Sequence, residues 1–225
     1  AGIGVDNIDC SAATERGVVV INTPSGNATT TAEHTIAMLM SLSRHIPQAD
    51  RSMHQGAWEK SKFTGTEITG KVLGIFGFGN IGKIVADRAL GLRMRVLVSD
   101  PFLNEQIVAK HGFELVSNDV LFERSDYISV HVPLNDTTRN LIDHKTIQSM
   151  KTGVSILNCA RGGIVNESAL LDGLNSGKIA GAAIDVFEEE PPQKDNPLLT
   201  HDRVICTPHL GASTAEAQVN VAIQA

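Results

Sequence analysis

The sequence predicts an α/β fold built on a doubly wound parallel sheet. Short apolar segments alternate along the chain with amphipathic segments of helical period, and a glycine-rich turn joins one apolar segment to the helical segment that follows it. The apolar segments lack a polar face, so we expect them to be strands that helices cover on both sides. Ligands of such a sheet bind at the carboxyl ends of its strands.

The expected elements follow in order along the chain. A first strand is expected at 18–21, before the segment TPSGN, in which proline and glycine interrupt regular structure. Further strands are expected at 71–77, 95–100, 127–132, 155–160, 181–186 and 203–208. Helices are expected at 29–45, 81–92, 104–110, 144–150 and 167–176, where apolar residues recur at helical spacing. Strand and helix therefore alternate from residue 71 onward.

The composition excludes several classes of protein. The 225 residues are 42% apolar, which suffices for a buried core, yet no apolar run approaches the roughly 20 residues of a membrane span. The net charge is -6 and the cationic residues are scattered, which argues against a nucleic-acid partner. Because the chain opens on Ala1 rather than on Met, we expect a truncated N-terminus.

The cysteines and histidines indicate neither a metal site nor a disulfide framework. Cys10, Cys159 and Cys206 are odd in number, far apart and without a CxxC pair. The histidines show no HxxxH spacing. We therefore expect no metal and a cytoplasmic location, since the cytosol keeps thiols reduced.

A glycine fingerprint predicts a Rossmann-like dinucleotide site. The segment GFGNIG follows the strand expected at 71–77 and opens the next helix, as the mechanism of this motif requires. Gly77 permits the tight turn, Gly79 lets the backbone approach a pyrophosphate, and Gly82 lets helix and strand pack closely. Asp100 ends the next strand, where its carboxylate can accept ribose hydroxyls and repel a 2′-phosphate. NAD is therefore the expected cofactor.

Three later loops each carry a charged or titratable residue at a strand end. These residues are Arg161 in NCARGG, Glu190 in DVFEEEPP and His209 in CTPHLGAS, and they suit hydride transfer to or from a small 2-hydroxy acid. Histidine titrates near neutrality, so His209 is the expected base and returns the proton in the reverse reaction. Glu190 can orient the imidazole and favour its protonated form. Arg161 offers a planar fork to a carboxylate.

Each of these residues also has a structural interpretation. Arg161 could pin a loop, Glu190 could be one solvated member of an acidic run, and His209 could be a helix-end residue. The combination on one nucleotide fold favours catalysis. For His34, on the long helix, a core or capping role is favoured over catalysis. Trp58, in a polar loop, indicates either an interface or local packing.

Seven motifs in fixed order carry a resemblance to a known family. They are AGIGVDNID, NTPSGN, GTEITGKVLGIFGFGNIG, HVPLNDTT, NCARGGIVNESAL, GAAIDVFEEEPP and TPHLGAST. The chain resembles the D-isomer-specific 2-hydroxyacid dehydrogenases over nearly its whole length. The resemblance places the catalytic arginine, glutamate and histidine of that family on Arg161, Glu190 and His209, which are the residues chosen above.

The resemblance also implies further contacts. NAD would touch, besides the glycines, Asn80, Ile81, Asp100, His131, Val132, Pro133, Cys159, Ala160, Arg161, Asp185, His209, Gly211 and Ala212. A small anionic substrate would touch Asn27, Gly2, Gly4, Arg161 and His209.

Family members have two lobes, which implies a division of this chain. Residues 1–28 would be the remnant of a flavodoxin-like substrate lobe, incomplete here, 29–213 the NAD-binding domain, and 214–225 the start of a helix returning to the substrate lobe. The resemblance implies a homodimer or homotetramer formed through the nucleotide-binding domain, with Trp58 near the contact.

The implied reaction is NAD-dependent oxidation of 3-phospho-D-glycerate to 3-phosphohydroxypyruvate, the first step of serine biosynthesis. One alternative is a glyoxylate, hydroxypyruvate or D-lactate reductase that uses the same three residues. Another is an NAD-sensing corepressor whose main work is to bind proteins, although the sequence shows no obvious partner-binding appendage. We expect the 225-residue chain by itself to bind NAD but to turn over poorly.

Overall fold

The computed structural model describes residues 4–5, 8–104 and 111–224, and these form one parallel sheet with helices on both faces. The seven strands that the described residues form lie in the order β3-β2-β1-β4-β5-β6-β7. Their bounds are β1 Val72–Phe76, β2 Arg95–Ser99, β3 Glu114–Leu115, β4 Tyr127–Val130, β5 Val154–Asn158, β6 Ile179–Ile184 and β7 Val204–Cys206. The expected doubly wound parallel sheet is confirmed.

The strand order reverses between β1 and β4, which are neighbours in the sheet although two strands separate them in sequence. Phe76, the last residue of β1, pairs with Ser99 of β2 on one side and with Val130 of β4 on the other. The chain therefore leaves β1 in one direction, returns and continues in the other. Such a switch point opens a crevice at the carboxyl ends of the two central strands.

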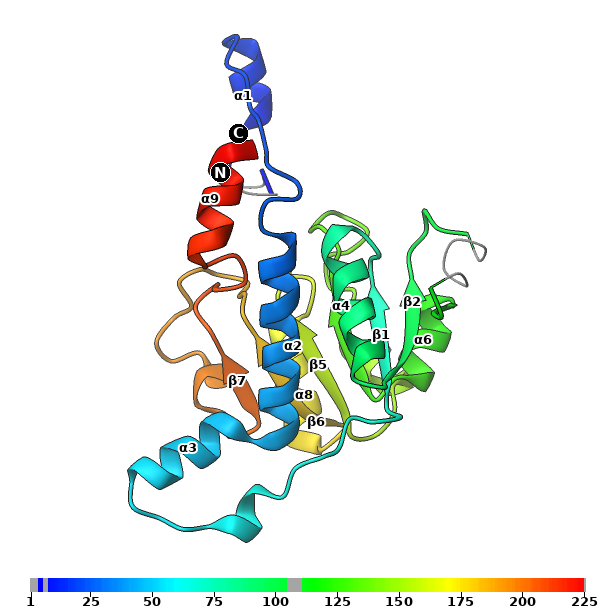
Figure 1. Ribbon diagram of the computed structural model, residues 1–225, viewed down its shortest axis with the longest axis vertical. Helices are drawn as coiled ribbons and strands as arrows, with labels where there is room; N and C mark the ends of the chain where they lie inside the picture. Colours follow the sequence, from blue (N-terminus) through cyan, green and yellow to red (C-terminus); the bar gives the residue numbers. More distant parts are fainter. Residues whose placement is uncertain (1–3, 6–7, 105–110, 225) are drawn as a thin grey trace.

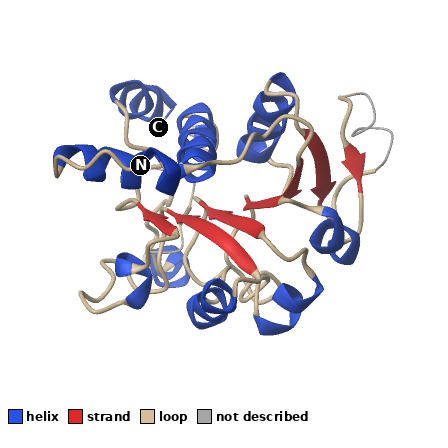
Figure 2. Cartoon of the chain, turned by 90° about the horizontal axis from the view of Figure 1, so that it is seen from below, coloured by secondary structure: helices blue, strands red, loops and turns tan. Residues whose placement is uncertain are grey.

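Two layers of helices cover the sheet (Figure 2). One layer holds α2 (Ala28–Arg44) and α4 (Asn80–Gly91), which pack on each other. The other holds α6 (Asn118–Arg124), α7 (His144–Ser149) and α8 (Glu167–Ser176). Since both faces are covered, the strands are apolar on both sides, as the sequence indicated.

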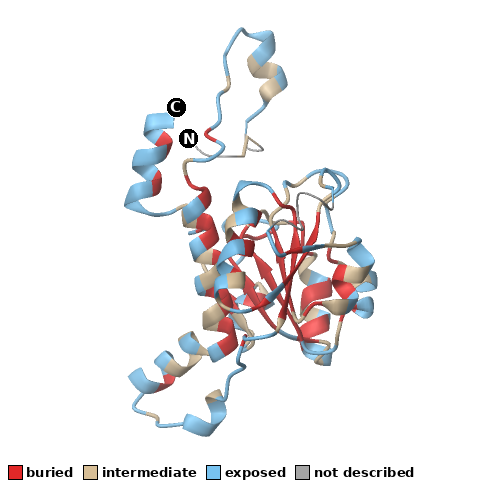
Figure 3. Cartoon of the chain, turned by 45° about the vertical axis from the view of Figure 1, so that its right-hand side comes forward, coloured by how far each residue is buried: buried red, intermediate tan, exposed pale blue. Residues whose placement is uncertain are grey.

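The core consists of two apolar clusters, one on each face of the sheet. Ile75 of β1 packs in the first cluster with Leu39 of α2, whereas Phe76 packs in the second with Leu170 of α8. All four side chains are buried. Burial of such a side chain stabilises the fold by about 1.5–3 kcal/mol, and Figure 3 shows that the strands and the inner faces of the helices are buried.

Two parts of the chain project from this layered body (Figures 1 and 3). At one end of α2, the helix α3 (Ile46–His54) and the 3₁₀ turn η1 (Lys60–Phe63) form an arm that is mostly exposed. At the other end lie α1 (Cys10–Glu15) and α9 (Ala215–Gln224). A second 3₁₀ turn, η2 (Pro197–Thr200), precedes β7. No helix in the described part of the chain is long and apolar enough to cross a membrane.

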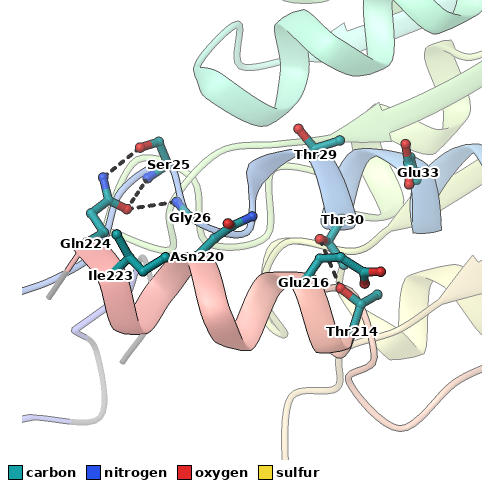
Figure 4. Close-up of a pocket in the computed structure, with 10 residues that line it drawn as sticks. All are labelled: Ser25, Gly26, Thr29, Thr30, Glu33, Thr214, Glu216, Asn220, Ile223 and Gln224. Atoms are coloured by element: carbon teal, nitrogen blue, oxygen red, sulfur yellow. Dashed lines mark hydrogen bonds between the residues drawn. The ribbon is translucent and has the colours of Figure 1, made fainter.

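Helix α9 returns to the turn that precedes α2. Gln224 Oε1 accepts hydrogen bonds from the backbone N–H groups of Ser25 (3.3 Å) and Gly26 (2.8 Å), and its Nε2 donates to Ser25 Oγ (2.7 Å). A Cβ at Gly26 would lie 2.9 Å from Cγ2 of Val221, so only glycine fits there. A groove between the two helices (Figure 4) is lined by Ser25, Gly26, Thr29, Thr30, Glu33, Thr214, Glu216, Asn220, Ile223 and Gln224.

The structure corrects the expected elements at several points. The strand expected at 18–21 does not form, and Val18, Val19 and Ile21 are exposed. An apolar β-branched run becomes a strand only beside another strand, and no described strand lies there. Helices α3 and α6 were missed; the proline in the first turn of α3 satisfies helix geometry rather than ending a helix. The helix expected at 104–110 lies largely outside the described residues.

Candidate active site

The glycine turn lies between β1 and α4 at the switch point. Gly77 has φ 86°, and a Cβ there would lie 2.5 Å from the carbonyl oxygen of His131. A Cβ at Gly82 would collide with the carbonyl oxygen of Gly77. At Gly79, by contrast, a Cβ would meet no atom of the described residues within 4 Å. The turn is therefore packed tightly on its protein side and open on the side where a pyrophosphate would approach, in front of the first N–H groups of α4.

Asp100 follows β2 and is fixed against this turn. Its Oδ2 accepts a hydrogen bond from Phe78 N (2.8 Å) and its Oδ1 accepts one from Phe102 N (2.9 Å). A carboxylate has about four lone-pair sites, so these bonds leave capacity for ribose hydroxyls. The predicted ribose acceptor thus stands next to the predicted phosphate turn.

The segment of His131, Val132 and Pro133 follows β4 on the other side of the switch point. The His131 ring shares a hydrogen bond with Ser129 Oγ through Nε2 (2.9 Å), and burial lowers the pKa of His131 to about 4. The imidazole is therefore neutral at physiological pH. Its Nδ1 is buried and makes no hydrogen bond within the described chain.

The loop after β5 carries Arg161. Asn158, which is buried at the end of the strand, donates through Nδ2 to Arg161 O (2.9 Å) and accepts from Ala160 N (3.1 Å). The Arg161 guanidinium donates to Ala160 O through Nη1 (2.7 Å). Cys159 is buried, and this burial raises the pKa of its thiol to about 12. Asn158 thus fixes the backbone of the loop at Ala160 and Arg161, a role that the sequence did not reveal.

Glu190 and His209 form a direct pair. Glu190 Oε2 lies 2.7 Å from His209 Nδ1, while Oε1 accepts a hydrogen bond from Phe187 N (3.2 Å). The side chains are 37% and 47% exposed, so the pair is reachable by a small molecule. With Nδ1 committed to the carboxylate, Nε2 is the imidazole nitrogen that can exchange a proton with a substrate.

Asp185 organises the loop that carries His209. The carboxylate is fully buried and accepts hydrogen bonds from Thr207 Oγ1 (2.6 Å), Leu210 N (2.7 Å) and Gly211 N (2.8 Å). The backbone carbonyl oxygen of Asp185 accepts a hydrogen bond from His209 N (2.9 Å). This bond helps to hold His209 in the left-handed region, at φ 53°. Burial by itself raises the pKa of Asp185, but these donors and a histidine from α2 outweigh it and keep the pKa below its ordinary value.

That histidine is His34, whose Nε2 lies 3.2 Å from Thr207 Oγ1 and 3.3 Å from Asp185 Oδ1. The sequence favoured a core or capping role for His34, whereas its Nε2 contacts support the loop of His209. The ligating atoms of His34, Cys159 and Asp185 lie within 4.8 Å of one another. However, Thr207, Leu210 and Gly211 already donate hydrogen bonds to both oxygens of Asp185, so this donor set fits a hydrogen-bond network better than a metal.

The Arg161 loop packs directly against the loop of Glu190. A Cβ at Gly162 would collide with the carbonyl group of Phe187, so the two loops touch through their backbones. The predicted guanidinium, carboxylate and imidazole therefore come from three loops at one sheet edge. Several other predicted contacts lie in the loops at this edge, namely Val132, Pro133, Ala160, Gly211 and Ala212, and Ile81 lies in the first turn of α4.

The residues expected to face substrate from the first segment are less clearly placed. Asn27 is the N-cap of α2 and is buried, and its Oδ1 makes no hydrogen bond within the described chain. Gly4 lies within the described residues and is partly buried, whereas Gly2 lies outside them. One link was not foreseen: Asn80 Nδ2 donates to Pro24 O (3.0 Å), which joins the phosphate turn to the first segment.

A family model described as "D-isomer specific 2-hydroxyacid dehydrogenase, NAD binding domain" matches residues 36–211. The chain belongs to the D-isomer-specific 2-hydroxyacid dehydrogenases. The predicted family, Rossmann-like fold and NAD cofactor are thereby confirmed for the part of these dehydrogenases that the chain contains.

Relatives within this dehydrogenase family cover the whole chain. The D-3-phosphoglycerate dehydrogenase of Bacillus subtilis is 53% identical over 100% of the chain, and that of Archaeoglobus fulgidus is 52% identical over 98%. The chain spans only 42% of the length of each.

Solved structures of the family share the fold. The pyruvate reductase of Chlamydomonas reinhardtii superposes with a TM-score of 0.91 at 33% identity, over 99% of this chain and 71% of that one. A glyoxylate reductase from Paecilomyes thermophila gives 0.90 at 36% identity, over 99% and 67%. A D-lactate dehydrogenase from Aquifex aeolicus, complexed with NAD and lactic acid, gives 0.87 at 30%, over 98% and 71%.

Proposed function

We propose that this chain carries the cofactor site and the acid–base machinery of an enzyme that oxidises 3-phospho-D-glycerate to 3-phosphohydroxypyruvate with NAD. The observation that carries the proposal is the 2.7 Å contact between His209 Nδ1 and Glu190 Oε2, beside the Arg161 loop. The substrate assignment is supported by relatives of about 50% identity that are named D-3-phosphoglycerate dehydrogenase.

Each residue has a defined task in this reaction. Arg161 holds the substrate carboxylate, and His209 Nε2 accepts the proton of the C2 hydroxyl as that oxygen becomes a carbonyl. Glu190 stabilises the imidazolium that results, and in the reverse direction the same imidazolium returns the proton. NAD, when bound, accepts the hydride that leaves C2, so the electron pair of the C2–H bond and the hydroxyl proton are both accounted for.

The residues that would hold NAD are the glycine turn and Asp100. The open side of Gly79 admits a pyrophosphate at the start of α4, and the Asp100 carboxylate disfavours a 2′-phosphate. Asp100→Asn keeps an oxygen for a backbone donor but removes the charge. We expect this variant to narrow the preference for NAD over NADP by about tenfold, and an unchanged ratio of dissociation constants would argue against the role of Asp100.

Substrate profiling separates the proposed activity from the nearest alternative. In full-length protein, we expect phosphohydroxypyruvate to be reduced with a higher kcat/KM than glyoxylate or pyruvate. Equal or lower values for phosphohydroxypyruvate would instead favour a reductase such as the glyoxylate and pyruvate reductases that share the fold. Arg161→Gln and His209→Ala should each abolish most turnover. Unchanged rates in these variants would favour a protein-binding, NAD-sensing role.

We also infer that residues 1–28 and 214–225 belong to a second, substrate-binding lobe. The inference is supported by the hydrogen bonds between Gln224 and Ser25 and by the position of α1 and α9 away from the sheet. A cytoplasmic location stays a prediction; the three cysteines are free, which fits a reducing compartment.

A homodimer or homotetramer through the nucleotide-binding domain is a further part of this proposal. The arm of α3 and η1 projects from the body and exposes Ile46 (54%), Met53 (53%) and Trp58 (80%). An exposed apolar group of this kind favours a contact with a second copy. We expect Trp58→Ser to lower the molar mass measured by light scattering, and an unchanged mass would exclude Trp58 from the contact.

A further inference from the structure

The first residue of α8 is tied to the loop that carries Glu190. Glu167 N donates to Glu188 Oε1 (3.0 Å), and Glu188 N donates back to Glu167 Oε1 (2.8 Å). Each residue therefore satisfies a backbone N–H group of the other. Because Glu167 begins a helix of ten residues, the Glu188 carboxylate also lies at the positive end of the helix dipole.

Other contacts fix Glu167 in turn. Its Oε2 accepts a hydrogen bond from Asn196 Nδ2 (2.8 Å), and the helix it begins is capped by Asn166, whose side chain accepts from Ala169 N. The carboxylate thus has a defined position although it lies near the surface. A fixed carboxylate can transmit position to the loop it binds.

The loop from Phe187 to Glu190 is held on two sides. On one side, the backbone of Gly162 packs against Phe187 so closely that a Cβ would collide with its carbonyl group. On the other side, Glu167 holds Glu188. Phe187 N then donates to Glu190 Oε1, and Glu190 Oε2 reaches His209. The position of the Glu190 carboxylate therefore depends on both constraints.

We propose that Glu167 is a positioning residue for the Glu190–His209 pair, an inference that rests on the proposed function. Glu188, Glu189 and Glu190 are consecutive acids whose charges repel one another, and the reciprocal hydrogen bonds with Glu167 hold this run in one conformation. Without them, the loop relaxes and the Glu190 carboxylate moves from Nδ1. A displacement of about 1 Å in a catalytic group can cost 10²-fold in rate.

The test compares three variants in full-length protein. Glu167→Ala removes the acceptor for Glu188 N, whereas Glu167→Gln keeps an amide oxygen for it. Glu189→Ala is the matched control, because it also removes one carboxylate, from the residue next to Glu188, and that carboxylate contacts Gln193 at 3.1 Å rather than α8. Thermal unfolding checks that each variant is folded.

We expect Glu167→Ala to lower kcat about tenfold or more with KM changed less than twofold. Ketoacid reduction needs the protonated imidazole, so its rate falls as the pH is raised. In Glu167→Ala this fall should begin at a lower pH than in wild type, because the imidazolium has lost its carboxylate partner. Glu167→Gln should recover to within about threefold of wild type, and Glu189→Ala should match wild type in both measurements.

A spectroscopic readout makes the test independent of substrate. The Nδ1 proton of a histidine bound to a carboxylate resonates far downfield, and we expect this signal in wild type, Glu167→Gln and Glu189→Ala but not in Glu167→Ala. A protein that shows the signal but no turnover contradicts the proposed function alone. If Glu167→Ala keeps the signal, the pH profile and kcat and loses only thermal stability, or if Glu167→Gln fails to recover, the positioning role is overturned.

Discussion

Replacing Asp185 by asparagine tests whether this carboxylate holds the loop of His209 in place. Oδ1 accepts Thr207 Oγ1 and Leu210 N, and Oδ2 accepts Gly211 N, all from inside the protein. Asparagine keeps one oxygen and converts the other acceptor into an NH₂ donor. Whichever way the amide turns, a buried donor then faces another donor.

The magnitude follows from these contacts. The less costly orientation turns the NH₂ group toward Gly211 N, and one buried N–H without an acceptor costs about 1–3 kcal/mol. The bonds from Thr207 and Leu210 lose a charged acceptor, which removes about 1 kcal/mol from each. We therefore expect the free energy of unfolding at pH 7 to fall by about 3–5 kcal/mol, a large fraction of the roughly 5–15 kcal/mol of an ordinary domain.

Urea unfolding followed by circular dichroism measures this loss. Asp172→Asn is the control, because Asp172 is exposed and its partner His144 is exposed as well, so we expect a change below about 1 kcal/mol. A free energy for Asp185→Asn within about 0.5 kcal/mol of wild type would refute the argument, since the loop would then hold its shape without the charge.

The remaining predictions concern the cofactor turn, acid stability and thiol reactivity. Gly82→Ala should weaken NAD binding at least tenfold by calorimetry because its Cβ collides with the turn, whereas Gly91→Ala, with open space at the other end of α4, should bind normally. The pKa of Asp143 is lowered mainly by hydrogen bonds from a helix N-terminus, and that of Asp185 is lowered as described. In acid the unfolded chain therefore binds more protons than the folded chain, and acid favours unfolding. The urea concentration at the unfolding midpoint should be flat from pH 7 to about 5 and decline below about pH 4. A midpoint that rises on acidification would contradict this direction. Cys159, with its pKa near 12 and its burial, should resist iodoacetamide at pH 8 and react in urea, as peptide mass analysis would reveal; rapid native labelling would contradict the burial.

The sequence predicted the sheet well because its signals are local. Apolar runs, the glycine turn and the helix of Glu167 each depend on residues close in sequence, and their observed bounds lie within about two residues of those expected. The strand expected at 18–21 failed because a strand also needs a neighbour, which local composition does not report. Helix α3 was not predicted, although its proline lies in the first turn, where a helix accommodates it.

In the candidate site, too, the residues with a local sequence signal were predicted and those fixed by distant contacts were not. The sequence found Glu190 and His209 because each follows a strand end beside proline or glycine. It missed the support from His34 and from Glu167, since hydrogen bonds between distant residues leave no local pattern. One signal was present: Asp185 is an acid inside the apolar segment GAAIDVF, and a buried acid needs several donors around it.

The contact between α9 and the turn before α2 indicates how the sheet-forming part of the chain could be inserted into another protein. Gln224 bonds the backbone of Ser25 and Gly26, so the chain enters and leaves this part at adjacent points (Figure 4). A segment whose ends meet in this way can be inserted into a surface loop of a host protein without stretching either one. An insert that begins near Ser25 and ends near Gln224 would therefore have both of its junctions at one edge.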